Sequence, residues 1–379
     1  MFIATAIHWL LPALAAAGIT YTALAALLVR EHSPLAAAPG ELHPAVTLLK
    51  PLCGAQPGLE EDLRSYFRQD YRGSLQILCG VQTRSDPALA VVKKLARDFP
   101  GIRADIVVDG TARGRNPKVA NLINMFPTAT GDILLLSDSD IRVPTHYVDT
   151  LVRELRLPGV GAVTCPYRGF AADGWWSRLE AMGIDYGFLP NAMTGTALGL
   201  AAPCFGATIG LRRDTLAEIG GFEALSDHLA DDYELGRAVR AKGYAVKLSS
   251  LVVQHTCTEP SFRALFRHEL RWARTIRLLN GIGHAGSVIT YPVPLALIAS
   301  AVTEQGSTAL ALVGCAVGVR LLLAWRIRNG TGAQSGPLWL LPLRDVLSFV
   351  VFLASFLGNS VYWRGTRYET EARGLLVQQ

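Results

Sequence analysis

The placement of the apolar residues constrains this chain most. Long uncharged segments lie at both ends, and a charged stretch, residues 43–280, lies between them. Residues 5–29 carry no formal charge, and about 20 apolar helical residues suffice to cross the hydrocarbon core of a bilayer. No basic segment precedes them, and they exceed the apolar core of about 7–15 residues of a cleaved signal peptide. We therefore expect residues 1–30 to form a transmembrane anchor.

Three further apolar blocks follow the charged stretch, at residues 285–303, 306–325 and 346–363. They predict a C-terminal membrane region over residues 281–363 with about three apolar segments, and a tail over residues 364–379. Pro292 and Pro294 interrupt the first block, because proline cannot donate the backbone hydrogen bond of a continuous helix. Two arrangements stay open: three C-terminal spans, or two spans and one re-entrant or interfacial block.

Basic residues near the apolar segments predict the orientation, because Lys and Arg are retained on the cytoplasmic side of a membrane. Arg30, Arg326 and Arg328 follow the first and third segments and place the charged stretch in the cytoplasm. Four spans in all would put the tail outside, whereas its arginines favour the inside: Arg364, Arg367 and Arg373. We expect a multi-pass protein of the cytoplasmic membrane whose charged domain faces the cytoplasm.

Composition agrees with a chain that is partly membrane-bound and partly water-soluble. Its residues are 50% hydrophobic, with a mean hydropathy of +0.27 and a formal net charge of +5. This small charge, without a basic stripe that carries interleaved aromatics, excludes a nucleic-acid surface and fits a surface beside anionic lipid. The six cysteines form no CxxC pair, so we expect reduced core residues: Cys53, Cys79, Cys165, Cys204, Cys257 and Cys315.

The charged stretch alternates between strand-like and helix-like segments, which predicts one α/β domain over residues 45–280 after a linker at residues 31–44. The strands are expected at residues 45–50, 74–82, 103–109 and 131–137, and the helices at residues 59–69, 86–99 and 117–126. Repeated strand–helix units with nearly continuous apolar strands are typical of a parallel sheet covered by helices on both faces. In such sheets ligands bind beyond the carboxyl ends of the strands.

Two carboxylates follow one of these strands, in the segment ILLLSDSDIRV. Asp138 and Asp140 are one residue apart, and neighbouring like charges need a compensating cation. A divalent metal that prefers oxygen ligands, such as Mg²⁺ or Mn²⁺, would supply it. The alternative is structural, with Asp138 at the start of a turn and Asp140 capping a helix that opens near Pro144.

Further charged residues of the domain favour a site for a phosphosugar. Asp86 follows another predicted strand, Asp231 and Asp232 open a predicted helix, and Arg271 and Trp272 lie just before the membrane region. A metal and an arginine can neutralise a diphosphate leaving group, and a separate carboxylate can deprotonate an acceptor hydroxyl. These residue types therefore point to glycosyl transfer.

A family resemblance follows from seven segments taken in order. KPLCGAQPGLEEDL, DPALAVVKKL, RNPKVANL, SDSDIRV, LADDYELGRAV, RHELRW and WRGTRY resemble the motifs of ceramide glucosyltransferase-like enzymes (glycosyltransferase family 21), over residues 46–368. The segments LNGIGHAGSVITYPVPLAL and CFGATIGLRR and the HELRW form are most similar to bacterial hopanoid biosynthesis-associated glycosyltransferases. The resemblance implies a GT-A fold, a UDP-sugar donor, a divalent metal, inversion at the anomeric carbon and a membrane lipid acceptor.

The resemblance also implies roles for the aspartates. Asp86 matches the aspartate expected near the uracil of UDP, Asp138 matches the second family aspartate, and Asp232 matches the general base. Asp140 completes a DxD pair where ceramide enzymes commonly carry Gly, which predicts firmer metal dependence. The alternatives are that Asp86 only caps its helix, and that Asp231 is the base or the cap of its helix.

Other motif residues are expected at the diphosphate and the acceptor. Arg271 and Trp272 match the RW of the Q/RxxRW signature, while His268 replaces its first residue and is expected to be neutral at pH 7. Trp272 could instead be an interfacial aromatic. The family segment NPKxxNL suggests that Lys118 and Asn121, with Asn116, face the nucleotide; otherwise Lys118 is an ordinary solvated lysine.

Three functions compete. The first is a lipid glycosyltransferase, in its most specific form passing N-acetylglucosamine from UDP-GlcNAc to bacteriohopanetetrol in a bacterial inner membrane, with glucosyl transfer from UDP-glucose to ceramide as the alternative. The second, a processive polysaccharide synthase, usually has more spans and a Gln three residues before the Arg. The third, a non-catalytic membrane scaffold, would not need these acidic and basic residues together. In the first case residues 283–294 are expected to line an acceptor portal.

Overall fold

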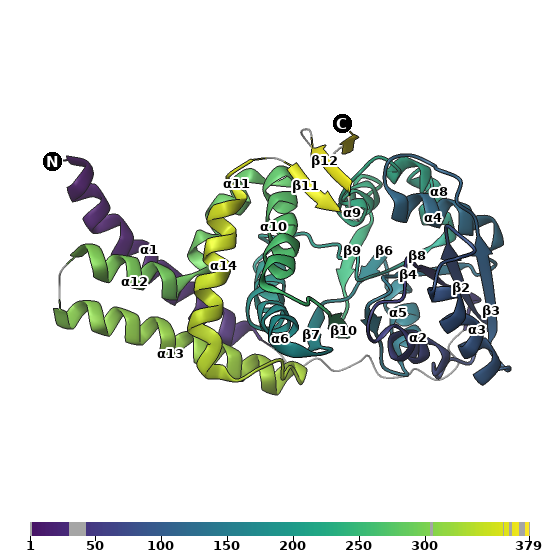
Figure 1. Ribbon diagram of the computed structural model, residues 1–379, viewed down its shortest axis with the longest axis horizontal. Helices are drawn as coiled ribbons and strands as arrows, with labels where there is room; N and C mark the ends of the chain where they lie inside the picture. The colour runs from purple at the N-terminus through teal and green to yellow at the C-terminus, as the bar shows by residue number, and fades with distance from the viewer. Residues whose placement is uncertain are drawn as a thin grey trace.

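The computed structural model describes residues 2–29, 43–303, 306–358, 360–363, 366–370 and 376–378. Arg30, nearly all of the predicted linker and half of the predicted tail lie outside these residues. The molecule is elongated (Figure 1), with helices α1 (Phe2–Leu28), α12 (Pro292–Thr303) and α13 (Gly306–Thr331) at one end and a sheet domain at the other.

A seven-stranded sheet forms the centre of the domain, in the order β3-β2-β1-β4-β8-β6-β9. Its strands are β1 (Val46–Pro51), β2 (Leu75–Val81), β3 (Arg103–Val108), β4 (Ile133–Ser137), β6 (Val160–Thr164), β8 (Thr208–Arg212) and β9 (Ala245–Leu248). The four predicted strands pair in parallel, but β8 is antiparallel to both β4 and β6. The expectation of a wholly parallel sheet is therefore wrong, because alternation along a sequence does not determine the edge from which each strand enters.

Helices cover both faces of this sheet, as predicted. They include α2 (Leu59–Phe67), α3 (Ala88–Asp98), α4 (Pro117–Met125), α5 (Tyr147–Leu155), α8 (Arg213–Glu218) and α9 (Asp231–Ala241). Successive residues of a strand face opposite sides, so Leu48 and Leu49 enter two different hydrophobic clusters, one on each face. This double burial explains the continuous apolar strands of the sequence.

A smaller sheet lies beside the end of β4. It contains β5 (Ile141–Arg142), β7 (Tyr167–Ala171) and β10 (Val253–Cys257). β10 pairs with β5 in the antiparallel direction, with His255 opposite Ile141. Helix α6 (Gly174–Gly183) continues through a π-helical segment, Ile184–Phe188, into α7 (Leu189–Ala197), and α10 (Phe262–Leu279) follows β10. This layer places residues from distant parts of the chain beside β4.

Among the described residues, three helices are long and apolar enough to cross a membrane: His8–Leu28, Gly306–Thr331 and Leu338–Ser355. The predicted block 285–303 is broken, since Gly281–Thr290 and Pro292–Val302 meet at an angle of 73°. Pro292 begins the second part, at a position where its missing N–H disturbs the helix least. The two parts comprise α11 (Gly281–Gly286), a 3₁₀ turn (Ser287–Thr290) and α12.

The last predicted block, residues 346–363, has different boundaries in the structure. Helix α14 runs over Leu341–Ser355, and Ser360–Trp363 form strand β11 instead of continuing a span. β11 pairs with β12 (Thr366–Thr370), which pairs with β13 (Leu376–Gln378). Hydropathy could not separate strand from helix here, because both segments are apolar and adjacent.

Candidate active site

The two carboxylates of the DSD segment lie at the carboxyl end of β4, as expected. The backbone oxygen of Asp138 accepts hydrogen bonds from Ile141 N at 3.4 Å and from Lys50 Nζ at 2.5 Å. Asp138 therefore does start a turn. Asp140 does not cap a helix, since β5 follows it and α5 begins only at Tyr147 after its N-cap His146. The structural alternative explains one of the two aspartates.

Lys118 neutralises part of the negative charge of the acidic group, which consists of Asp138, Asp140, Asp231 and Asp232. Its Nζ lies 2.8 Å from Asp138 Oδ1 and 3.5 Å from Asp231 Oδ2, and its side chain is only 14% exposed. Burial alone would lower the pKa of Lys118, but Asp138, Asp231 and Asp232 outweigh it and raise that pKa. The solvated alternative for Lys118 is therefore wrong.

Asp140 pairs with a histidine from the smaller sheet. His255 Nε2 lies 3.4 Å from Asp140 Oδ2. Burial would raise the pKa of Asp140, but His255 and then Lys50 lower it to about 2. Asp140 Oδ1 is buried and has no hydrogen-bond partner among the residues that the structure describes. An ionised carboxylate with one unsatisfied oxygen, beside Asp138, fits the oxygen ligands that Mg²⁺ and Mn²⁺ prefer.

Asp232 lies in the first turn of α9, across the group from Asp140. The N-cap of α9 is Ala230, so neither Asp231 nor Asp232 is the cap residue. Asp232 Oδ2 accepts a hydrogen bond of 2.7 Å from Gly206 N. Burial, followed by the charge of Asp231, raises the pKa of Asp232 to about 6 although Lys118 opposes the shift. A carboxylate with this pKa is suited to accept a proton near neutral pH.

Asp86 and Asn116 make local contacts that shape the site. Asp86 Oδ1 accepts hydrogen bonds from Ala88 N at 2.9 Å, in the first turn of α3, and from Gly54 N at 3.1 Å. The N-cap of α3 is Pro87, so Asp86 is not the cap residue itself, but it binds the first residue of α3 and ties it to the loop after β1. Asn116 caps α4 through Lys118 N at 2.9 Å, which orients Lys118 toward the carboxylates.

Asn121 does not join this group. It is 3% exposed, and its Nδ2 donates a hydrogen bond of 2.9 Å to Gly80 O in β2. The Asn121 side chain therefore contacts the interior of the sheet.

The RHELRW segment lies in α10, above the acidic group. Arg271 is largely buried, which lowers its pKa, while the charges of Asp138, Glu259 and Asp140 oppose that shift. The Arg271 guanidinium makes no hydrogen bond within the described part of the chain, so it is free to meet an anion. Trp272 packs against the main hydrophobic cluster, with its ring 4.6 Å from that of His268. Trp272 is therefore partly buried against the domain.

His268 lies between two glutamates that the sequence reasoning missed. Its Nδ1 is 2.6 Å from Glu259 Oε1 and 3.2 Å from Glu180 Oε1. Burial lowers the pKa of His268, but Glu180 and Glu259 outweigh it and raise that pKa. The expectation of a neutral His268 is thus not supported, because these carboxylates favour the imidazolium form.

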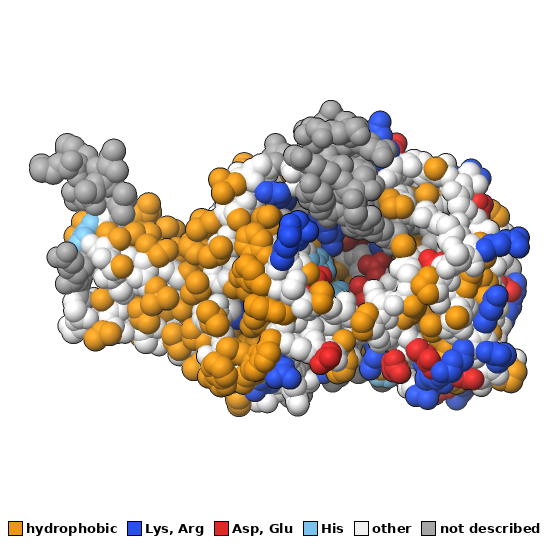
Figure 2. Space-filling model, in the orientation of Figure 1, with side chains coloured by type: hydrophobic (Ala, Val, Ile, Leu, Met, Phe, Trp, Pro, Cys, Tyr) orange, Lys and Arg blue, Asp and Glu red, His pale blue; other side chains and the backbone are white. Residues whose placement is uncertain are grey.

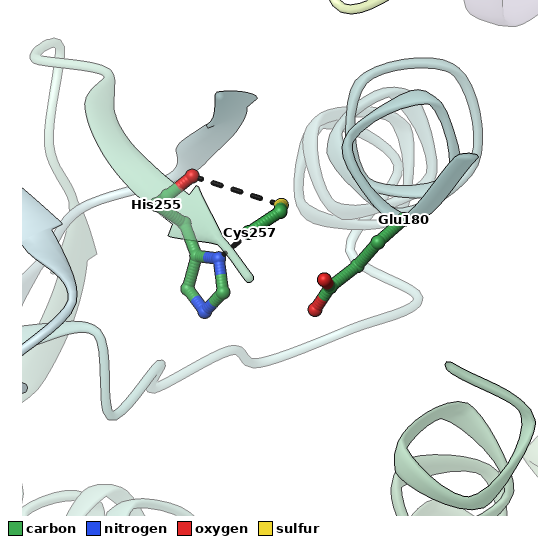
Figure 3. A group of neighbouring side chains, drawn as sticks. All are labelled: Glu180, His255 and Cys257. Carbon is green, nitrogen blue, oxygen red and sulfur yellow. Dashed lines mark hydrogen bonds between the residues drawn. The ribbon is translucent and has the colours of Figure 1, made fainter. Parts of the chain in front are cut away.

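Glu180 also approaches a second histidine. Figure 3 shows the Glu180 side chain reaching from its helix toward His255 and Cys257 on one strand. Glu180, His255 and Cys257 could hold a metal by spacing, as could Glu180, Glu259 and His268. Asp140 raises the pKa of His255 against burial, and burial raises that of the Cys257 thiol to about 12. Protonated side chains are poor metal ligands, so both groups are better described as ion-paired and hydrogen-bonded networks.

The sequence reasoning missed four residues of the site, and the sequence indicates them to different degrees. They are Lys50, Glu180, His255 and Glu259. Lys50 stands at the end of an apolar strand and is fully buried, and a buried lysine needs a partner, so its position was informative. The other three reach the site only through contacts between distant elements. Figure 2 shows a hollow between the helical end and the sheet domain, with acidic and histidine side chains at its floor.

Comparisons with known proteins agree with this geometry. The sequence matches the model of glycosyl transferase family 21 over residues 10–376. Ceramide glucosyltransferase 1 of Caenorhabditis elegans is 26% identical over 233 residues, which are 61% of this chain and 49% of the relative. The ceramide glucosyltransferase of Candida albicans is 35% identical over 126 residues, which are 30% and 23%. This chain thus spans about half the length of the first relative and less of the second.

A solved structure shows the fold. A mannosyltransferase from Pyrobaculum calidifontis, in complex with GDP-Man and Mn²⁺, has a TM-score of 0.54 and 20% identity, covering 94% of this chain and 97% of that chain. At this identity the likeness concerns the fold alone. The predicted GT-A fold with apolar helices at both ends is therefore confirmed.

Proposed function

Because the chain belongs to glycosyl transferase family 21, we propose that it transfers a sugar from a UDP-sugar to a membrane lipid alcohol. The observation that carries this proposal is the convergence of Asp138, Asp140, Asp232 and Arg271 at the carboxyl end of β4. Transfer from a nucleotide sugar requires two carboxylates suited to a metal, a carboxylate with a raised pKa, and an arginine, and Arg271 has no hydrogen-bond partner among the described residues.

The acceptor reaction needs a base and an anion site. Asp232 takes the proton of the acceptor hydroxyl while the acceptor oxygen forms a bond to the anomeric carbon. The bond from that carbon to the diphosphate breaks on the opposite side, and its electron pair leaves with UDP. Arg271 neutralises the negative charge that develops there. One inversion at the anomeric carbon follows from this single displacement.

A divalent ion fits this site. Asp138 and Asp140 would hold Mg²⁺ or Mn²⁺, which when bound neutralises the diphosphate of the donor. Neither aspartate belongs to a group of three convergent ligands in the described ranges, and Mg²⁺ commonly uses one or two carboxylates together with substrate phosphates. The Mn²⁺ in the mannosyltransferase of the same fold supports this assignment.

The lipid acceptor and the sugar have two specific candidates. The relatives named ceramide glucosyltransferase support glucosyl transfer from UDP-glucose to ceramide. The HELRW form and the segment after it support N-acetylglucosaminyl transfer from UDP-GlcNAc to bacteriohopanetetrol. In either case the domain faces the cytoplasm from a bacterial inner membrane, and residues 283–294 line the acceptor portal.

Lipid mass spectrometry of a host with and without the gene tests the proposal. Loss of a hexosyl-ceramide would select the first candidate, and loss of a hexosamine-bearing hopanoid would select the second. The purified protein should then release UDP only when the matching lipid and donor are both present. Unchanged lipids together with no UDP release from either donor would overturn the proposal.

A further inference from the structure

Helix α14 resembles a membrane span in length and composition, yet its start is fastened to the sheet domain. Arg344 is 4% exposed and donates hydrogen bonds to Glu269 Oε1 in α10 at 2.5 Å and to Leu179 O in α6 at 2.8 Å. The next residue, Asp345, forms an ion pair of 2.6 Å with Arg320 of α13. The first turn of α14 therefore lies where charged side chains of the domain meet a buried arginine within α13.

The other end of α14 returns to the same helix of the domain. Arg274 of α10 donates hydrogen bonds to Leu357 O and, at 2.6 Å, to Ser360 O. Arg277 of α10 donates one of 3.0 Å to Gly358 O. A straight helix cannot have both ends on one charged helix and still emerge on opposite sides of a bilayer. α14 thus lies along α10 and does not cross.

The geometry of α14 agrees with this position. Its apolar segment, Leu338–Ser355, has 18 residues, close to the roughly 20 that a crossing helix needs, so direction and contacts, and not length, distinguish it from a span. Figure 1 shows α14 running across the direction of α1 and α13. A helix that runs across the direction of the spans lies along the membrane surface.

One face of α14 is apolar and uncovered. Leu343, Val350 and Leu353 are 61%, 46% and 49% exposed, and their spacing of seven and three residues places them on one stripe. Leu357, two residues past the end of α14, is 73% exposed. The opposite face packs Phe349 and Phe352 into a cluster with Ala15 of α1, Val293 of α12 and Ala316 of α13. The uncovered stripe is therefore continuous with the helices that enter the bilayer.

We propose that α14 is an interfacial helix that rests on the bilayer through this leucine-rich stripe, and that the chain crosses the membrane only through α1, α12 with its broken entry, and α13. Amphipathic helices of this kind bury their apolar face in the boundary between headgroups and acyl chains. Strands β11, β12 and β13 then stay on the side of the sheet domain. This arrangement agrees with the basic tail, which four crossings would have placed on the far side.

The proposal does not depend on the glycosyl transfer proposed above. It does indicate how close the candidate site lies to the membrane, because α10 carries Arg271 and Trp272 and packs directly against α14. The candidate site is thus one helix away from the membrane surface, where the headgroup of a lipid acceptor would lie.

Depth measurements on nitroxide labels test the proposal. Single cysteines are placed at Leu343, Val350 and Leu357, in the full chain reconstituted in phospholipid vesicles, after Cys53 and Cys315 are replaced by Ala. Collision rates with oxygen and a water-soluble nickel complex report depth. Labels at Leu310 and Leu322 on α13 are the control, since 12 residues correspond to about 18 Å along a crossing helix. We expect one shared shallow depth on α14 and two different depths on α13.

A graded depth along α14, like that on α13, would overturn the proposal. Side labelling gives an independent measurement that needs no change within α14. An impermeant maleimide should label the native exposed Cys53 and a Gln379→Cys variant from the same face of sealed vesicles, with Cys315 replaced by Ala. Labelling of the two thiols from opposite faces would contradict the proposed set of three crossings.

Discussion

Lys118 and Asp138 form an ion pair of 2.8 Å at the carboxyl end of β4. The same ammonium lies 3.5 Å from Asp231, and Asp232 follows in the same turn of α9. Lys118 therefore lies beside three carboxylates. The Lys118 ammonium lowers the pKa of Asp138 and of Asp232, against the burial and the like charges that raise both.

Lys118→Met should weaken transfer and change its pH dependence. Lys118 lowers the pKa of Asp232, so its loss raises that pKa, and the acidic limb of the pH–rate profile should move to higher pH. Steady-state rates between pH 5 and 9 check this. Lys94→Met is the control, because Lys94 pairs with Glu60 at the surface. An unchanged acidic limb in Lys118→Met would contradict the pairing.

Asp231→Asn should shift the same limb in the opposite direction. The charge of Asp231 raises the pKa of Asp232, so its neutralisation lowers that pKa below about 6, and activity should persist to lower pH than in the wild type. The rate profiles of the two variants and of Asp98→Asn, a surface control, separate a local charge effect from a general one. A shift to higher pH would show that Asp231 does not act on the base through its charge.

Asp232→Asn should abolish most of the turnover. Loss of a general base lowers a rate by about 10²–10⁴-fold, while binding of UDP should be largely retained because Asn keeps the shape of the side chain. Calorimetric titration with UDP, run beside the rate assay, measures both. Near wild-type turnover in this variant would exclude Asp232 as the base.

Excess EDTA should stop transfer, and Mn²⁺ or Mg²⁺ should restore it. The reason is that Asp138 and Asp140 lie together with one buried, unsatisfied oxygen, and a bound ion would satisfy it. An Asp140→Asn variant should need a higher metal concentration for half-maximal rate. Full activity of the wild type in EDTA would refute the metal assignment.

His268→Gln should reduce stability at low pH more than at high pH. Burial lowers the pKa of His268, but Glu180 and Glu259 raise it further than burial lowers it, so the folded state binds the proton more tightly than the unfolded chain. This stabilisation is complete below the unfolded pKa of about 6.5 and disappears as pH rises through the folded pKa. Thermal unfolding at pH 6 and pH 9 measures it, with the exposed His146→Gln as control. Equal losses at both values would contradict the ion pairs.

Several features of the fold and site were accessible from the sequence. The four N-terminal strands and the helices between them were predicted because apolar runs of strand length and capped helices are local signals. Asp138 and Asp140 were placed correctly at a strand end for the same reason. The partners of His268 and Asp140 were not predicted, since Glu180, Glu259 and His255 meet them across elements that lie far apart in the chain.

The sequence by itself determined that this chain has apolar helices at both ends and an α/β domain between them, because hydrophobic periodicity and chain length are properties of a local segment. Only the tertiary structure decided that β8 runs antiparallel, that α14 lies along α10 and that the acidic group carries Lys118 and His255. Strand direction, helix orientation and the pKa of a buried group depend on what packs beside them. The sequence of a single segment does not determine which distant segments pack against it.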